Sequence, residues 1–183
     1  MENALDRHDV TRRTALRGAA GLAIGAAGLA AVIAASAQSA TPAVGSGVTQ
    51  TAALTTEGAL AVMQAALAKA REIGVPEVIA VVDAAGDLKA FARMVGTPNS
   101  SIDIAKDKAF TSASFHAPTD QLAKGFGADP VSLGSFLKLP HISLLAGGYP
   151  LMSGETVIGA IGCSGGTGAQ DQQCSQAGLA ALG

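Results

Sequence analysis

The fold is decided by the segment VIAVVDAAGDLKAFARM, residues 78–94. Residues 78–82 form a short β-branched run of the kind that builds a strand. Residues 83–87 contain two aspartates and a glycine, which favour a turn. From Leu88 to Met94 the side chains alternate in the manner of a second strand, with Lys89 and Arg93 in the more polar set. The segment therefore predicts an antiparallel β-hairpin.

Helices and further strands are predicted on either side of this hairpin. Thr55 or Thr56 can cap a first helix, and Ser100-x-x-Asp103 resembles a capping box that opens a second one. The apolar residues of the first helix recur at Leu60, Met63, Leu67 and Ala70. The predicted elements are helices 55–73, 100–114, 118–124 and 171–182, and strands 78–82, 88–94, 141–145, 149–152 and 156–163. Hairpin-like pairs without regular βαβ alternation favour an α+β domain, whose central five-stranded antiparallel sheet is flanked by helices.

The N-terminal residues have the layout of an export signal. Arg12 and Arg13 precede an uncharged, Ala- and Gly-rich run of 18 residues, 18–35, and Ala35-Ser36-Ala37 supplies a small-x-small cleavage pattern. The arginine pair resembles a twin-arginine signal, which predicts a periplasmic or extracellular protein. An uncleaved membrane anchor is the alternative, although alanine and glycine contribute little transfer energy. We therefore predict a signal peptide at 1–37, a flexible leader at 38–54 and one domain at 55–183.

Composition excludes one class of partner. The chain has 12 Lys and Arg against 14 Asp and Glu, and only 3% of its residues are aromatic. Such a chain offers neither a basic surface nor a series of rings for stacking bases, so nucleic acid is not expected as a partner.

No motif of the sequence completes a catalytic site. Residues 162–166 match G-x-S-x-G, but the histidine that should follow the serine is missing. Asp103 and Asp107 can share a helix face, where Lys106 and Lys108 make a solvated charge network the simpler interpretation. Zinc-type spacing of Cys and His is absent from the sequence.

The two cysteines leave two interpretations open. Cys163 and Cys174 both lie in the exported part, where they could form a disulfide that closes a short loop. Burial of Cys163 as a plain hydrophobe is the alternative.

A haem ligand can be sought among few side chains. The sequence has no C-x-x-C-H, which excludes covalent c-type attachment. The candidate ligands are His116, His141, Met63, Met94, Met152 and Tyr149, followed by a hydroxyl oxygen. His116 attracts most interest because Phe110 and Phe115 are close to it in sequence, while its simpler role is to interact with the carbonyl groups at a helix C-terminus.

Seven segments, in this order, resemble the GlcG/HbpS family, which includes the C-terminal domain of PduO. They are residues 81–86, 91–94, 101–111, 117–119, 147–150, 158–166 and 170–171. The resemblance covers about Thr55 to Gly183. It implies a profilin-like fold, a homo-oligomer and non-covalent haem binding by a non-enzymatic protein, which sequesters haem or iron and can inform a membrane sensor kinase.

Site residues follow from this resemblance. It implies that His116, Thr119 and Arg93 face the ligand, with His116 as the metal ligand and Lys106 as a partner for a propionate. Phe110 and Phe115 are expected to line a pocket for a flat molecule. The sequence departs from the family pattern at Val95, where an acidic residue is common, and at Cys163, where an aliphatic residue is usual.

A second function stays open at this point. A small enzyme or accessory protein of organic-acid or aromatic catabolism could hold a carboxylate with the glycine pairs at 147–148 and 165–166.

Overall fold

The computed structural model of the chain describes residues 49–182. The predicted signal peptide and most of the predicted leader lie outside the described residues. Among residues 49–54, Leu54 is buried in the core.

The central sheet contains four strands in the order β2-β1-β4-β3, and all neighbouring pairs are antiparallel. The strands are β1 (Val78–Asp83), β2 (Leu88–Arg93), β3 (Gly148–Ser153) and β4 (Thr156–Ser164). The predicted hairpin is confirmed, since β1 and β2 pair from Val78 with Arg93 to Val82 with Leu88. The α+β class is also confirmed, but the number of strands is four and not five.

The strand predicted at 141–145 is wrong. This segment is a loop that lies against α2 (Ser101–Phe115). His141 has φ 60°, a left-handed conformation that does not continue a strand. The Thr111 hydroxyl accepts a hydrogen bond from the amide of Ser143 and donates one to the carbonyl of His141. The polar backbone of the loop is thus partly satisfied by a helix side chain and not by a neighbouring strand.

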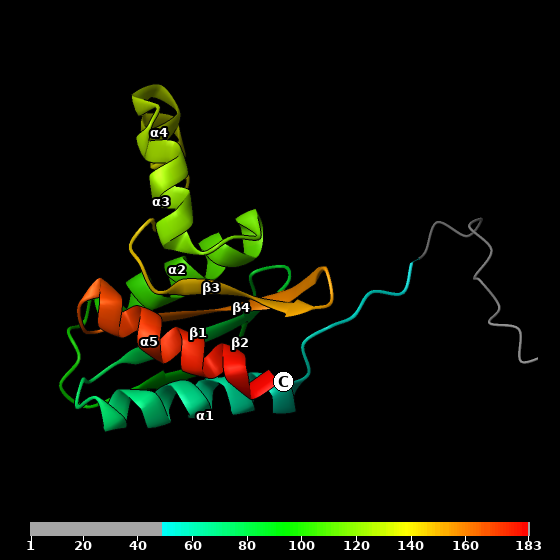
Figure 1. Cartoon of the computed structure of the whole chain (residues 1–183), viewed down its shortest axis with the longest axis vertical. Coiled ribbons are helices and arrows are strands. Elements are labelled where there is room, and N and C mark those ends of the chain that lie inside the picture. The colour runs from blue at the N-terminus through cyan, green and yellow to red at the C-terminus, as the bar shows by residue number, and fades with distance from the viewer. Residues whose placement is uncertain (1–48, 183) are drawn as a thin grey trace, which may run out of the picture. The chain divides into compact units, whose positions relative to one another are not determined.

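Helices cover both faces of the sheet (Figure 1). On one face, α1 (Thr56–Glu72) and α5 (Gly168–Leu179), the latter followed by a 3₁₀ turn (Ala180–Leu182), enclose a core with Ile79, Val81, Ile161 and Cys163. On the other face, α2 packs through three alanines on the alternate residues of β1, such as Ala80 and Val82. Alternation along the strands therefore directs side chains into two cores.

Small residues let α2 approach the sheet closely. Ala105, Ala109 and Ala113 form its buried stripe. A Cβ atom added at Gly162 would collide with the backbone carbonyl of Ala105, and one at Gly148 would lie 2.5 Å from that of Lys108. The alanine and glycine content of this domain is thus a requirement of helix–sheet packing.

Two details of the helices differ from prediction. In α1 the Thr55 hydroxyl accepts a hydrogen bond from the amide of Gly58, as predicted, but Val62 and Ala66 are buried while Leu60 is 40% exposed. In α2 the predicted capping box is wrong, because Ser100 has a helical backbone and makes no side-chain cap. Packing therefore buries a face of α1 centred on Val62 and Ala66, and not the face that was predicted from Leu60, Met63 and Leu67.

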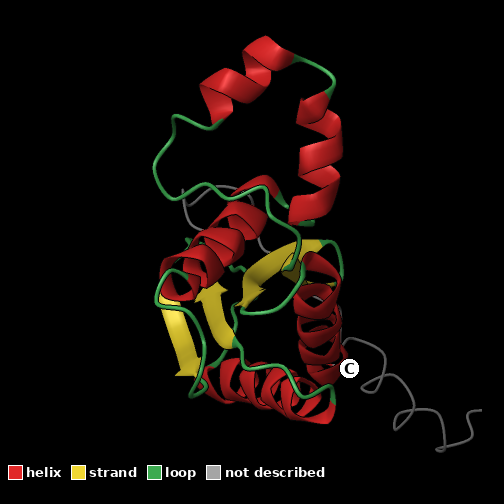
Figure 2. Cartoon of the chain, turned by 90° about the vertical axis from the view of Figure 1, so that its left-hand side faces the viewer, coloured by secondary structure: helices red, strands yellow, loops and turns green. Residues whose placement is uncertain are grey.

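A pair of helices extends away from the sheet (Figures 1 and 2). It consists of α3 (Thr119–Gly127), which was predicted as shorter, and α4 (Pro130–Phe136), which was predicted as loop. Asp129 caps α4 with its carboxylate, and Pro130 occupies the first turn, where its missing N–H costs nothing. We call residues 119–139 the α3–α4 arm. Within the described residues, no helix is long and apolar enough to cross a membrane.

Candidate functional site

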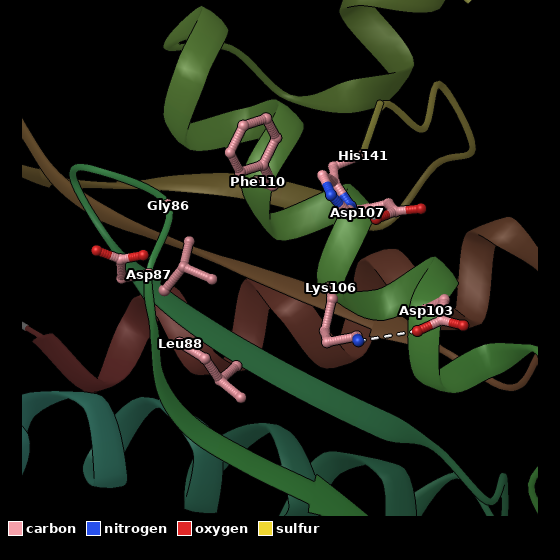
Figure 3. A pocket seen from close by; sticks show the side chains of 9 residues that line it. Gly86, Asp87, Leu88, Asp103, Lys106, Asp107, Phe110 and His141 are labelled. Atoms are coloured by element: carbon pink, nitrogen blue, oxygen red, sulfur yellow. Dashed lines mark ion pairs between the residues drawn. The ribbon is translucent and has the colours of Figure 1, made fainter. Parts of the chain in front are cut away.

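A cavity of about 610 Å³ opens between the β1–β2 turn, α2 and the loop that contains His141 (Figure 3). We call it the His141 pocket. Its lining residues are Val82, Gly86, Asp87, Leu88, Asp103, Lys106, Asp107, Phe110 and His141. Pockets of about 300–1,000 Å³ are of the size that holds drug-sized ligands and cofactors.

The imidazole of His141 is held between an acid and an aromatic ring. Its Nδ1 lies 3.4 Å from Oδ1 of Asp107, and its ring meets the Phe110 ring edge-on with centroids 5.9 Å apart. A histidine that directs one nitrogen at a carboxylate presents the other nitrogen to a ligand, which is the usual arrangement around metal-binding histidines. The side chain of His141 is 71% exposed, so it is accessible from the pocket.

The charges of the pocket are mostly paired. Lys106 lies 2.8 Å from Asp103, and Asp107 faces His141. Asp87 belongs to the β1–β2 turn, where its amide binds the Asp83 carboxylate. The pocket therefore combines a histidine, an aromatic wall and one ammonium group that a ligand carboxylate could share.

The predicted site residues divide into two groups. Lys106 and Phe110 line the His141 pocket, whereas His116, Thr119, Arg93 and Phe115 do not. His116 follows α2 as its C-cap with φ 55°. Thr119 is fully buried, and its hydroxyl donates to the carbonyl of Leu145 and accepts from the amide of Gly148.

The other two residues also have structural partners. The Arg93 guanidinium donates to the hydroxyl and the carbonyl of Thr97, at the end of the hairpin. Phe115 packs with Phe126 and Phe136 in an aromatic cluster that joins α2 to the α3–α4 arm. The ligand roles of these residues stay predictions.

His141 was among the ligands considered from the sequence, but its contact with Asp107 was not predicted. The two residues are far apart in the chain, and the strand predicted at 141–145 concealed the loop that joins them. Pro140 before His141 was the available signal, because proline commonly precedes or begins a turn.

A buried charged cluster lies elsewhere, where β4 ends and β3 begins. Lys108 of α2 is 1% exposed, and its ammonium donates to Oδ2 of Asp171 at 2.6 Å and to the carbonyl of Cys163 at 2.7 Å. A Cβ at Gly147 would lie 3.1 Å from this nitrogen, and one at Gly162 would lie 3.1 Å from Lys108 Cβ. The glycines thus make room for a buried lysine. The prediction that Lys108 belongs to a solvated surface network is wrong.

Glu77 completes the cluster. It is fully buried, and neither carboxylate oxygen accepts a hydrogen bond within the described residues. Burial, followed by the neighbouring charge of Asp171, raises the pKa of Glu77 to about 8. A protonated Glu77 has a proton to donate to Asp171, which explains how a second acid is accommodated beside only one lysine.

The remaining motifs are structural. Cys163 and Cys174 are free buried thiols, and burial raises the pKa of Cys163 well above its ordinary value and that of Cys174 to about 12. Neither is a reactive thiolate at neutral pH. Ser164 of the G-x-S-x-G match is only 5% exposed, and no histidine hydrogen-bonds to it in the described part of the chain. Residues 49–182 contain no group of three or more Cys, His, Asp or Glu placed to hold a metal ion.

The glycine pairs proposed as carboxylate loops have packing roles. A Cβ at Gly165 would collide with the carbonyl of Pro76, and one at Gly166 would lie 2.8 Å from Val75. A Cβ at Gly147 would crowd the Lys108 ammonium, and one at Gly148 would crowd the Lys108 carbonyl. Close packing therefore accounts for the small size of these four residues.

Comparisons with known proteins agree with this fold. A Citrobacter freundii protein, an uncharacterized 15.0 kDa protein in the dhaT-dhaS intergenic region, is 35% identical over 136 residues, which are 71% of this chain and 92% of that protein. The corrinoid adenosyltransferase PduO of Salmonella typhimurium is 32% identical over 121 residues, 65% of this chain but only 36% of PduO. The chain thus matches about a third of PduO.

Two solved structures are similar over most of their length. A double mutant of Streptomyces reticuli HbpS has a TM-score of 0.70 and 36% identity, covering 76% of this chain and 93% of HbpS. A complex of PduOC with heme has a TM-score of 0.66 and 31% identity, covering 71% of this chain and 95% of PduOC. A family model described as "Haem degrading protein HbpS-like" matches residues 54–180, and the chain therefore belongs to the HbpS-like family.

Proposed function

We propose that this protein binds haem non-covalently in the His141 pocket. Support comes from the relatives and from the pocket: PduOC forms a complex with heme, and the chain belongs to a family described as haem degrading. Bound haem would supply an iron centre that takes a ligand from the protein.

The observation that carries the proposal is the pairing of His141 with Asp107 beside Phe110. His141 is the candidate iron ligand, Asp107 orients its ring, and Phe110 offers an apolar face to a flat molecule. Lys106 is the cation available to a propionate, if the propionate displaces Asp103. The histidine, the aromatic wall and Lys106 therefore fit haem, and the lining also holds three acids, Asp87, Asp103 and Asp107.

A hemin titration tests the proposal. We expect the purified protein to shift the Soret band of hemin at one-to-one stoichiometry, and we expect His141→Ala to change the spectrum and weaken binding by at least tenfold. His116→Ala is the matched control, because His116 lies outside the His141 pocket. Loss of binding in His116→Ala but not in His141→Ala would restore the ligand that the sequence favoured. A wild-type protein that leaves the Soret band unchanged would remove the proposal.

We further propose that the protein binds haem without degrading it. The family description names degradation, whereas the resemblance stated above implies a non-enzymatic protein, and this proposal follows the resemblance. The Soret band of the complex should then persist under air with ascorbate. Its decay, with release of iron to a chelator such as ferrozine, would show a haem-degrading enzyme instead.

Export and sequestration of haem outside the cell complete the proposal. Export rests on the arginine pair and the apolar run of the N-terminal residues. Replacing both Arg12 and Arg13 with lysine should leave the protein unprocessed inside the cell, which fractionation and mass spectrometry of the N-terminus would detect. Unchanged processing would exclude the twin-arginine route.

Self-association and a sensor partner are proposed with it. Self-association is supported by apolar side chains exposed on and beside the α3–α4 arm, namely Val131, Leu137, Leu139 and Leu145. A membrane sensor kinase as partner rests on the family resemblance alone. Hemin-dependent co-purification of a kinase after crosslinking in the native cell would test it. The alternative function in organic-acid or aromatic catabolism gains no support from the comparisons.

A further inference from the structure

A second cavity, of about 290 Å³, lies over the buried Lys108–Asp171 pair. Its walls come from the N-terminus of α2, the end of β4, the turn at 164–168 and the first residue of α5 (Figure 1 shows these elements). It shares no lining residue with the His141 pocket. Its lining residues are Pro98, Ser101, Ile104, Lys108, Leu145, Ala146, Ser164, Gly165, Gly166, Gly168 and Asp171.

Several N–H and O–H groups of the residues that line this cavity have no acceptor among residues 49–182. The ammonium of Lys108 has three N–H groups, and the described residues supply acceptors for two of them, Asp171 and the Cys163 carbonyl. The hydroxyls of Ser101 and Ser164, whose residues are 4% and 5% exposed, make no hydrogen bond in residues 49–182. In residues 49–182 the buried side-chain atoms without a partner are the carboxylate oxygens of Glu77, so the hydroxyls of Ser101 and Ser164 are open to the cavity that they line, where an acceptor can reach them.

Helix α5 adds a further donor and a partial positive charge. Thr167 and Gln170 form a capping box, in which the Thr167 side chain accepts from the Gln170 amide. The amide of Gly168, one residue inside the helix, has no acceptor among the described residues. A helix N-terminus with free amides favours an anion.

The acids nearby do not cancel this preference. Asp171 is already satisfied, because its Oδ1 accepts from the Gly166 amide at 3.0 Å and its Oδ2 accepts from Lys108. Glu77 lies behind the turn, where a Cβ at Gly165 would come within 3.0 Å of Glu77 Cα. Burial raises its pKa to about 8, which favours the protonated form at neutral pH. The donors that remain are those of Lys108, the two serines and α5.

We propose that this second cavity binds a small monocarboxylate, held by the free N–H of Lys108, the hydroxyls of Ser101 and Ser164, and the Gly168 amide. Charge selects a monoanion, because Asp171 neutralises Lys108 and the helix end supplies only about half a positive charge. Size selects a small molecule, since about 290 Å³ is roughly the space of ten waters. The site is independent of haem and implies no catalysis.

A titration followed by NMR tests this proposal. We add sodium acetate to the ¹⁵N-labelled protein at pH 7 and follow the amides of Gly166 and Gly168, with sodium chloride and sodium phosphate at equal ionic strength as comparisons. Saturable shifts with acetate that exceed those with chloride and phosphate support the proposal. Equal shifts with all three salts, or none with acetate, overturn it.

Variants assign the effect to the cavity. The double variant Ser101→Ala/Ser164→Ala removes two donors with little change in volume and should weaken acetate binding by at least fivefold. Ser153→Ala, at the exposed β3–β4 hairpin, is the control and should bind as the wild type does. Unaltered affinity in the double variant would place acetate elsewhere and overturn the proposal. Hemin binding should be unchanged in both variants, so this proposal and the haem proposal can fail separately.

Discussion

We predict that Glu77 makes the stability of this protein depend on pH, and that a single substitution removes this dependence. The Glu77 carboxyl group is fully buried next to Asp171, and its oxygens accept no hydrogen bond from the described residues. Glu77→Gln keeps the size of the side chain and supplies an amide N–H in place of the acid proton. It therefore preserves a donor toward Asp171 and abolishes the titration.

The sign and size follow from the pKa. A carboxyl group whose pKa is higher in the folded chain than in the unfolded chain contributes to stability at low pH, where it is protonated. This contribution is lost as the pH rises from the unfolded pKa of 4.5 to the folded pKa of about 8. A pKa difference of one is worth about 1.4 kcal/mol, so the whole loss is about 5 kcal/mol. Between pH 5 and pH 9, about 4 kcal/mol of it is lost.

Urea unfolding at pH 5, 7 and 9 measures this effect. The free energy of unfolding of Glu77→Gln, minus that of the wild type, should increase by about 4 kcal/mol from pH 5 to pH 9. Glu155→Gln is the control, because Glu155 is exposed in the turn between β3 and β4. Its difference from the wild type should stay constant over the same range.

One result would refute the reasoning. If the difference between Glu77→Gln and the wild type is the same at pH 5 and pH 9, Glu77 titrates alike in the folded and unfolded chains. Its burial beside Asp171 would then leave its proton affinity unchanged. A uniformly lower stability of Glu77→Gln would mean only that the amide fits less well.

Three further predictions concern the site, the packing and the assembly. Asp107→Asn should retain hemin binding but weaken it by roughly tenfold and shift the Soret band, as loss of an outer-shell partner does at metal-bound histidines; an unaltered spectrum and affinity would show that Asp107 does not orient His141. Gly162→Ala should lower the free energy of unfolding by about 3 kcal/mol or more, because its Cβ collides with the α2 backbone, whereas Gly134→Ala, with open space around it, should be neutral or slightly stabilising; equal urea midpoints for the two variants would contradict the close approach of α2. If the protein self-associates as proposed, Leu139→Asp should reduce the mass measured by light scattering while the circular dichroism spectrum is retained, and an unchanged mass would exclude Leu139 from the contact.

Local sequence determined the elements whose signals lie within a few residues. The hairpin at 78–94 needs only a β-branched run, a turn and an alternating strand, and all three were confirmed. The helix after Thr55 has a cap that was predicted from the sequence. The closing helix was predicted without a cap from residue 171, whereas α5 begins at Gly168 behind a capping box of Thr167 and Gln170. The resemblance to the GlcG/HbpS family agreed with the family found by comparison.

Tertiary structure decided the rest, because the deciding partners are distant in sequence. The loop at 141–145 bonds to Thr111 of α2, which no local propensity could indicate. Lys108 was predicted to lie at the surface, but Gly147, just before β3, and Gly162 of β4 leave space for its side chain beside Asp171.

The candidate site depends on the same kind of contact. His141 is a candidate ligand because it lies beside Asp107 and Phe110 of α2. The backbone of His141 has a positive φ. The sequence by itself therefore determined the class of fold, the hairpin and the family. Only the folded chain decided which charges are buried and which histidine has a carboxylate beside it, because burial and pairing are properties of contacts between segments far apart in the chain.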